Sequence, residues 1–143
     1  MPRPETPLLA VDIIIEPVHA PGRILLIERL NPPHGFALPG GFVDVGESLE
    51  QAAVREALEE TAMQVSLKAL LGCYSNPNRD PRGHTVSAVY IASGSGEPEA
   101  RDDARALQLV DPKHPPEPLV FDHSLILQDY LNYLEFGRMT PLR

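Results

Sequence analysis

Three glutamates stand close together in the segment from Gly41 to Met63, shortly after a Gly-Gly pair. In a helix each residue advances by roughly 100°, so Glu56, Glu59 and Glu60 would share an arc of about 100°. Like charges at this spacing destabilise a helix. The crowding is most easily explained by a cation among the carboxylates, and Mg²⁺ is the hard, oxygen-seeking ion that suits them.

The residues around the glutamates predict a helix from about Ser48 to Ala62. Ser48 followed by Gln51 is the pattern of a capping box, which starts helices. Val54 and Leu58 form an apolar i,i+4 pair on the side opposite the glutamates. We therefore expect this pair to face the core.

Further groups near this helix can contribute to a metal site. Arg55 precedes Glu59 by four residues, and its planar guanidinium can hold a carboxylate in place. The Gly40 carbonyl offers another oxygen, because glycine allows a close approach to the backbone. Glu47, at the helix entrance, adds a carboxylate. An ordinary solvated acidic face with an Arg-Glu pair is the alternative for this stretch taken by itself.

The whole arrangement resembles the Nudix box, G-x5-E-x7-R-E-U-x-E-E-x-G-U, in which U is a bulky apolar residue. A long motif with all its charged members present is a specific signal. Two positions depart from it, because Ala57 is small for the first U and Ala62 replaces the last glycine. The second change affects the exit turn of the helix and removes no ligand. The matching positions are Gly41, Glu47, Arg55, Glu56, Glu59, Glu60 and Met63.

The resemblance implies an α/β fold, namely an α/β/α sandwich with a mixed β-sheet between helices, in a single Nudix hydrolase domain over residues 1–143. It also implies hydrolysis of a diphosphate linkage that depends on Mg²⁺, with Mn²⁺ as a second candidate ion. Glu56 is the first candidate for activating water, with Arg55 and Glu59 in the same catalytic set. The implied metal ligands are Glu56, Glu59, Glu60 and the Gly40 carbonyl.

The segment Tyr74–His84 is the expected source of substrate choice. Pro77 follows the box at about the distance seen in the ADP-ribose pyrophosphatase subgroup, and the run R-D-P-R-G-H is similar to prokaryotic members of that subgroup. Arg79 and Arg82 are fork-shaped donors for phosphate oxygens, and Asp80 can orient one of them or accept from a ribose hydroxyl. The alternative is a polar surface turn.

Two later segments hold further candidates. In several family members the general base comes from a later loop, which makes Glu97 and Glu99 candidates. Asp122 is expected to cap the last helix. His123, in the first turn of that helix, is either a phosphate donor or proton shuttle, or a structural histidine.

The implied reaction converts ADP-ribose and water to AMP and ribose 5-phosphate. The first alternative is a nucleotide-pool sanitiser that cleaves nucleoside triphosphates to monophosphates with the same metal site. The second is a catalytically silent domain that senses a nucleotide or binds a partner. All charged residues of the box are present, which disfavours a silent domain.

Composition limits the partners and the location. The net charge of −8 argues against binding a nucleic acid polymer, because a phosphate backbone needs an excess of Lys and Arg. The single Cys73 excludes an intrachain disulfide and suits a reducing compartment. The first residues lack an apolar signal region, and Ile13–Ile15 is far shorter than a membrane span. We expect a cytoplasmic protein with a small nucleotide substrate, no membrane partner and, from the resemblance, a homodimer.

Periodicity and turn residues predict the remaining elements. Leu8–Glu16 and Arg23–Arg29 are expected to pair as a hairpin, and Ser93–Glu99 is expected to be flexible. The last helix is expected to end near Arg138, and its expected core residues are Leu125, Leu127, Leu131 and Leu134. The later expected strands are Val65–Tyr74, Thr85–Ala92 and Ala104–Val110.

Overall fold

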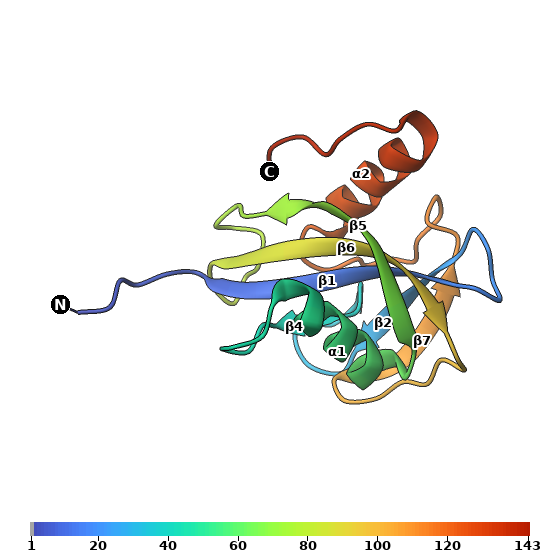
Figure 1. Ribbon diagram of the computed structural model, residues 1–143, viewed down its shortest axis with the longest axis horizontal. Helices are drawn as coiled ribbons and strands as arrows, with labels where there is room; N and C mark the ends of the chain where they lie inside the picture. Colours follow the sequence, from blue (N-terminus) through green and yellow to red (C-terminus); the bar gives the residue numbers. More distant parts are fainter. Residues whose placement is uncertain (1) are drawn as a thin grey trace.

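The computed structural model describes residues 2–143, and Met1 lies outside the described part. The strands form two sheets, and two helices flank them (Figure 1). Within residues 2–143, neither helix has the length and apolar character needed to cross a membrane. In chain order the elements are β1 (Leu8–Pro17), β2 (Ile24–Arg29), β3 (Phe36–Ala37), β4 (Gly40–Phe42), α1 (Leu49–Thr61), β5 (Gln64–Tyr74), β6 (Thr85–Ser95), β7 (Ala104–Val110) and α2 (His123–Phe136).

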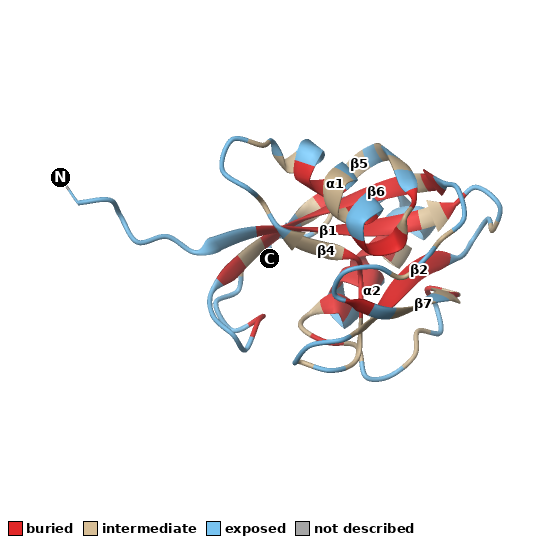
Figure 2. Cartoon of the chain, turned by 90° about the horizontal axis from the view of Figure 1, so that it is seen from below, coloured by how far each residue is buried: buried red, intermediate tan, exposed pale blue. Residues whose placement is uncertain are grey.

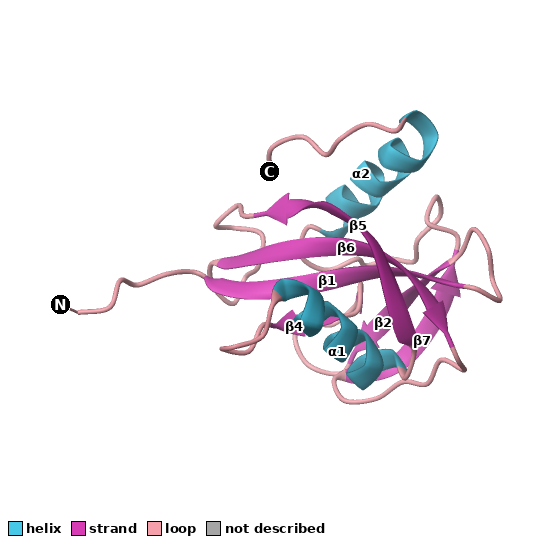
Figure 3. Cartoon of the chain, viewed as in Figure 1, coloured by secondary structure: helices cyan, strands magenta, loops and turns pink. Residues whose placement is uncertain are grey.

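The larger sheet has the strand order β4-β1-β6-β5, and the smaller sheet has the order β3-β2-β7. β1 and β6 run parallel, with Ile13 opposite Tyr90, whereas the other pairs are antiparallel. The larger sheet is therefore mixed. With α1 and α2 packed outside the strands (Figure 3), the predicted α/β/α sandwich is confirmed.

The two sides of β1 build separate cores, because successive side chains of a strand point to opposite faces. Ile14 packs with Ile126 and Tyr130 of α2. Ile13 packs with alanines of α1, among them Ala53. Figure 2 shows the buried residues concentrated on the strands between the helices. Each helix thus covers one side of the strands, which is the physical basis of the sandwich.

The predicted hairpin between the first two strands is wrong. β1 pairs with β4 and β6, while β2 pairs with β3 and β7 of the other sheet. Both strands are buried along most of their length, so each needs a hydrogen-bonded neighbour on both edges. Nearness in the chain does not decide which strands supply those neighbours.

β6 is longer than predicted and continues to Ser95. Gly94 pairs with Val65, and a side chain at Gly94 would meet Cγ2 of Ile15 at 2.7 Å. This glycine therefore serves close packing inside a strand. The first residues of the segment that was expected to be flexible therefore belong to strand β6.

α1 begins as predicted and buries a different face from the one predicted. Ser48 caps it, and the capping box with Gln51 is complete. Val54 and Leu58 are 41% and 43% exposed, so their assignment to the core is wrong. The buried apolar residues of the helix are Ala52, Ala53 and Ala57. Because alanines allow a close approach, α1 lies tightly on the strands and turns its glutamates toward the edge of the sheet.

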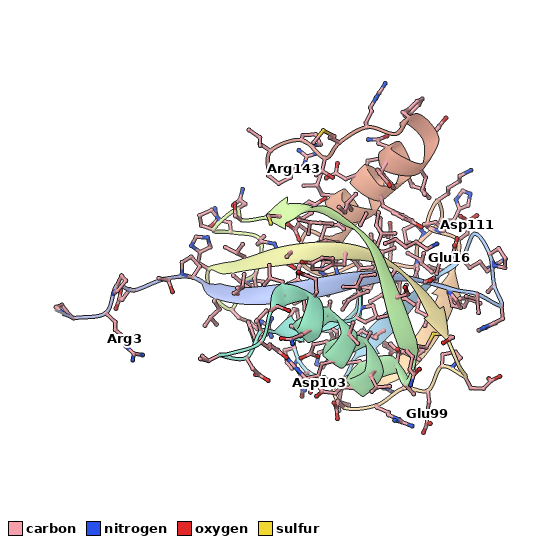
Figure 4. All side chains as sticks on the ribbon, in the orientation of Figure 1. Arg3, Glu16, Glu99, Asp103, Asp111 and Arg143 are labelled. Atoms are coloured by element: carbon pink, nitrogen blue, oxygen red, sulfur yellow. The ribbon has the colours of Figure 1, made fainter. Side chains whose placement is uncertain are left out.

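α2 also differs in its buried face. Leu125 and Leu134 are 39% and 56% exposed, so these two core assignments are wrong. Ile126, Leu127 and Tyr130 form the buried stripe at the spacing of a helix face. After α2 the chain returns along the helix, where Arg143 donates to Oδ1 of Asp129 at 2.8 Å; Figure 4 labels Arg143.

Candidate active site

A cavity of about 290 Å³ collects polar side chains from distant parts of the chain. Asp12 comes from β1, Arg29 from β2 and Glu60 from α1. Arg82 comes from the loop after β5, and Phe121 lies two residues before the start of α2. Carboxylates and guanidinium groups therefore line the same cavity, as a site for an anionic substrate and a cation would require.

Glu60 is the most deeply buried acid of α1, with 4% exposure. Its Oε2 has no hydrogen-bond partner within residues 2–143. Burial, and next the nearby Glu56 carboxylate, raise the pKa of Glu60 to about 9. Burial likewise raises the pKa of Glu56. A buried acidic pair with an unsatisfied oxygen is the kind of group that a bound cation would stabilise.

Arg55 joins the surrounding carboxylates into one network. Its Nη1 donates to Glu56 at 2.9 Å and to Glu59 at 3.1 Å. Its Nε and Nη2 donate to the two oxygens of Glu47 at 3.0 and 2.5 Å. Nη2 also donates to the carbonyl of Phe42 at 3.1 Å. The hydrogen bonds from Arg55 lower the pKa of Glu47 to about 2, so this acid stays ionised.

The Gly-Gly pair lies where the acidic side chains reach the backbone. A side chain at Gly41 would clash with the carboxylate of Glu56. A side chain at Gly40 would clash with Asp12 and with the carbonyl of Val11. Glycine is required at both positions because only bare backbone leaves room for these carboxylates.

A second, buried polar network lies behind the cavity. Arg79 is 8% exposed and donates to both oxygens of Asp122, at 2.9 and 2.7 Å. Asp12 accepts from the Ser87 hydroxyl at 2.5 Å and lies 4.0 Å from Nη2 of Arg79. Burial tends to raise the pKa of Asp12, but the nearby His123, Ser87 and Arg79 outweigh it and hold that pKa below its ordinary value.

The N-terminus of α2 connects this network to the glycine pair. Asp122 stands at the N-cap position, yet its side chain makes no capping hydrogen bond because it holds Arg79. Nδ1 of His123 accepts the N–H of Leu38 at 3.0 Å, so that nitrogen carries no proton. His123 is 2% exposed, and its Nε2 lies 3.7 Å from Oδ1 of Asp12. His123 also lines the cavity, so both alternatives for its role stay open as predictions.

The predicted substrate loop places its charged residues in different environments. Arg79 lines the cavity with a guanidinium that Asp122 already holds. Asp80 accepts from Arg82 at 3.1 and 2.8 Å and also from its backbone N–H. The Arg82 side chain is 46% exposed. Arg82 is thus the arginine of this loop with donors open to a ligand.

A profile of the NUDIX domain matches residues 6–130. The chain belongs to the Nudix family. It is 48% identical over 130 residues to the ADP-ribose pyrophosphatase of Methanocaldococcus jannaschii, a match that covers 89% of this chain and 75% of that protein. Together these similarities identify it as a Nudix hydrolase enzyme.

Two solved structures share the Nudix fold of this chain. The NUDIX domain of Shewanella oneidensis NrtR complexed with ADP ribose is 29% identical, with a TM-score of 0.76, and the match covers 91% of this chain and 90% of that one. A bifunctional NMN adenylyltransferase/ADP ribose pyrophosphatase of Francisella tularensis, complexed with AMP and a Mn ion, is 26% identical, with a TM-score of 0.77. That match covers 89% of this chain and 42% of the Francisella protein.

A divalent cation is the group that the Nudix family implies, and the acidic wall fits one. Glu56, Glu60 and Gly40 line the cavity, and the unsatisfied Glu60 oxygen is a ready ligand. Glu59 has a side chain that is 43% exposed and held by Arg55. In the described part of the chain, no three His, Cys, Asp or Glu side chains converge closely enough to enclose an ion. The donor set is hard oxygen, which suits Mg²⁺ or Mn²⁺.

Two sequence candidates for the general base lie outside the lining of the cavity, and other residues belong to that lining. Glu97 and Glu99 are exposed and do not line it, and Glu99 pairs with Arg101 at 3.2 Å on the outer connection between β6 and β7 (Figure 4). Sequence reasoning missed Asp12, Arg29 and Phe121. The sequence does contain an indication for Asp12, because an acidic residue is unusual inside the apolar run of a buried strand.

Proposed function

We propose that this Nudix hydrolase cleaves the diphosphate linkage of ADP-ribose, with Mg²⁺, to give AMP and ribose 5-phosphate. The observation that carries the proposal is one cavity that is lined both by Glu56 and Glu60 and by the open arginine Arg82. A diphosphate ester needs both groups, since a cation must neutralise its charge and donors must hold its oxygens. The similarity to an ADP-ribose pyrophosphatase and to a domain bound to ADP ribose supports ADP-ribose as the substrate among the possible diphosphate compounds.

The residues that would hold the ion are Glu56, Glu59, Glu60 and the carbonyl of Gly40. When bound, Mg²⁺ neutralises phosphate charge and lowers the pKa of a bound water, and Mn²⁺ would supply the same chemistry. Arg55 keeps the carboxylates of Glu56 and Glu59 in position through its two contacts at 2.9 and 3.1 Å. Glu56 lines the cavity, and its carboxylate would accept a proton from the attacking water.

Both cores contain strands from the two sheets, for example Ile14 and Ile24 in one of them. We therefore propose that residues 1–143 act as a single Nudix domain. The homodimer, the cytoplasmic location and the absence of a nucleic acid polymer among its partners remain predictions. The substrate is a small nucleotide.

The test is a substrate panel. The purified chain is incubated with Mg²⁺ and, in separate reactions, ADP-ribose, NADH, dinucleoside polyphosphates and nucleoside triphosphates, and the products are separated by chromatography. We expect AMP and ribose 5-phosphate from ADP-ribose at the highest kcat/KM. Faster cleavage of triphosphates would select the sanitising alternative, and no turnover of any substrate would select the silent domain.

A further inference from the structure

Asp129 is a buried acid of α2 that does not line the cavity of the active site. Its Oδ2 accepts from the Tyr74 hydroxyl at 2.7 Å and from Nε of Arg143 at 3.1 Å. Its Oδ1 accepts from Nη2 of Arg143 at 2.8 Å. These three residues, which we call the Asp129 network, join the end of β5, the middle of α2 and the segment that follows α2.

The Asp129 network lies at the base of the substrate loop, which we define as residues 75–84. Tyr74 is the last residue of β5, so the loop starts directly after it. The Ser75 hydroxyl donates to the carbonyl of Arg143 at 2.8 Å. Nε2 of His84, at the other end of the loop, donates to the Ser75 carbonyl at 3.0 Å. Arg143 therefore contacts both the buried acid and the residue at which the two ends of the loop meet.

The segment after α2 packs against β5 at the same place. A side chain at Gly72 would meet Cγ2 of Thr140 at 3.0 Å, so this glycine leaves room for the segment beside the strand. Burial, and next the hydrogen bond to Asp129, raise the pKa of Tyr74, so its hydroxyl keeps the proton that it donates. Figure 1 shows the chain returning past α2 toward the end of β5. Packing and hydrogen bonds together hold the segment against the start of the loop.

α2 holds the substrate loop at a second point. Asp122, at its N-terminus, accepts from Nε and Nη2 of Arg79, near the middle of the loop. Asp122 and Asp129 are seven residues apart, about two helical turns, so they lie on the same side of α2. The loop also carries Asp80 and Arg82, which line the cavity. The place of these two residues in the cavity thus depends on contacts from one helix.

We propose that Asp129 and Arg143 are positioning residues for substrate binding, because they fix the start of the loop that brings Arg82 to the cavity. Neither residue lines the cavity, so loss of the network should change how well the loop is held and leave the reacting groups intact. A rise in KM with an unchanged kcat is the kinetic result of such a change. This inference rests on the proposed function, because it concerns binding of the same substrate.

Arg143→Ala is the first test, because the Arg143 side chain is 28% exposed and its removal leaves the Tyr74 hydroxyl on Asp129. Hydrogen–deuterium exchange of the full chain should become on the order of fivefold faster in residues 75–84, because one charge-assisted contact is lost. Exchange in residues 49–61 of α1 should not change. In kinetics with Mg²⁺, KM for ADP-ribose should rise on the order of fivefold, and kcat should match the wild type.

Arg138→Ala is the matched control, because Arg138 is an exposed arginine of the same segment whose guanidinium contacts the Phe136 ring. It should leave both the exchange in residues 75–84 and KM at their wild-type values. Tyr74→Phe removes one donor from Asp129 and keeps the ring. This variant should also speed exchange in the loop and raise KM.

Wild-type exchange and wild-type KM in Arg143→Ala, or equal changes in Arg138→Ala, would overturn the proposal. Equally faster exchange in residues 49–61 would mean a general loss of stability and would overturn it too. A fall in kcat with an unchanged KM would refute a role in substrate binding. Faster exchange in residues 75–84, with residues 49–61 unchanged, in an enzyme that leaves ADP-ribose intact would refute the proposed function and sustain the role of the Asp129 network in holding the loop.

Discussion

Two arginines of this Nudix domain lie in contrasting networks. Arg55 contacts Glu47, Glu56 and Glu59, all within a short stretch of chain, and its side chain is 28% exposed. Arg79 contacts Asp122 at the start of α2 and approaches Asp12 on β1, and its side chain is 4% exposed. The first network orients carboxylates near water. The second ties together elements that are far apart in the chain.

The contrast separates catalysis from stability. Arg55 is the more accessible of the two arginines, so water and salt screen its ion pairs more and reduce their contribution to the free energy of unfolding. Removing one partner of a buried pair is costly, because it leaves an unpaired charge away from water. Substitutions in the Arg55 network should therefore reduce activity with the fold intact. Substitutions in the Arg79 network should reduce stability first.

The largest expected effect is on turnover, from Glu60→Gln. Loss of a buried carboxylate in the acidic wall should reduce kcat by on the order of a thousandfold, because phosphoryl transfer depends on charge stabilisation at this point. The far-UV circular dichroism spectrum should be unchanged. Glu135→Gln, on the exposed side of α2, is the matched control for the loss of one acid. Glu59→Gln should also abolish hydrolysis that depends on Mg²⁺, and full activity in both Glu60→Gln and Glu59→Gln would refute the metal site.

The next largest effect is on the free energy of unfolding, and it differs between substitutions of the two arginines. Arg79→Ala should lower the free energy of unfolding by about 3 kcal/mol, because Asp122 and Asp12 lose their buried positive partner. Arg55→Ala should lower it by less than about 1 kcal/mol while reducing kcat. Urea unfolding followed by circular dichroism measures both. Equal losses of stability in the two variants would remove the distinction between the networks.

Arg79→Ala also tests the substrate hypothesis derived from the loop sequence. That hypothesis expects a greater rise in KM for ADP-ribose than for a nucleoside triphosphate. The burial of Arg79 gives a reason for a rise without direct contact, since the loop that carries Asp80 and Arg82 would lose its anchor on Asp122. Equal changes in KM for both substrates would remove the loop from specificity.

A further effect concerns the pH dependence of stability in the protein without metal. Glu60 has a pKa of about 9 in the folded state, against an ordinary value of 4.5. Between these values the folded chain keeps a proton that the unfolded chain releases, so stability falls as pH rises. The stabilising contribution is complete below about 4.5 and is lost as pH rises through about 9. Urea unfolding in EDTA should show a decline of on the order of 1 kcal/mol per pH unit.

The control for this decline is Glu60→Gln, which has no titrating carboxyl at the position. Its stability between pH 6 and 9 should be nearly flat by comparison. A decline of the same slope in the variant would assign the pH dependence to another group. A flat wild-type profile would mean that the acidic pair is already ionised in the folded state.

The same division between local and distant contacts explains what the sequence predicts. The capping box of Ser48 and the extent of α1 follow from neighbours in the chain, and both are correct. The buried faces of the helices and the partners of β1 depend on which surfaces meet in three dimensions. The alanines of α1 pack closely on the strands, and Val54 is exposed. The local sequence pattern does not predict which of these two faces is buried.

The site divides in the same way. The contacts among Arg55, Glu56 and Glu59 follow from helical spacing. The pairing of Arg79 with Asp122 and the contact of Arg29 with Phe121 join residues from separate segments. A single sequence contains no periodicity that connects such positions. Asp12 is an intermediate case. Its unusual position in an apolar strand indicates a special role, but the sequence does not predict which residues it contacts.

The smallest expected effect lies at the end of α1, where the chain departs from the box. Ala62 has φ 61°, the left-handed conformation in which glycine is favoured at a helix C-terminus. Ala62→Gly should raise the free energy of unfolding by about 1 kcal/mol, because the backbone strain of alanine disappears. Ala57→Gly, in the buried interior of the same helix, should instead lower it by about 1 kcal/mol or more. Thermal unfolding measures both changes, and kcat of Ala62→Gly should match the wild type because no ligand is altered. A loss of stability in Ala62→Gly would mean that contacts of the Ala62 methyl group outweigh its backbone strain, so that even this local position is decided by distant packing.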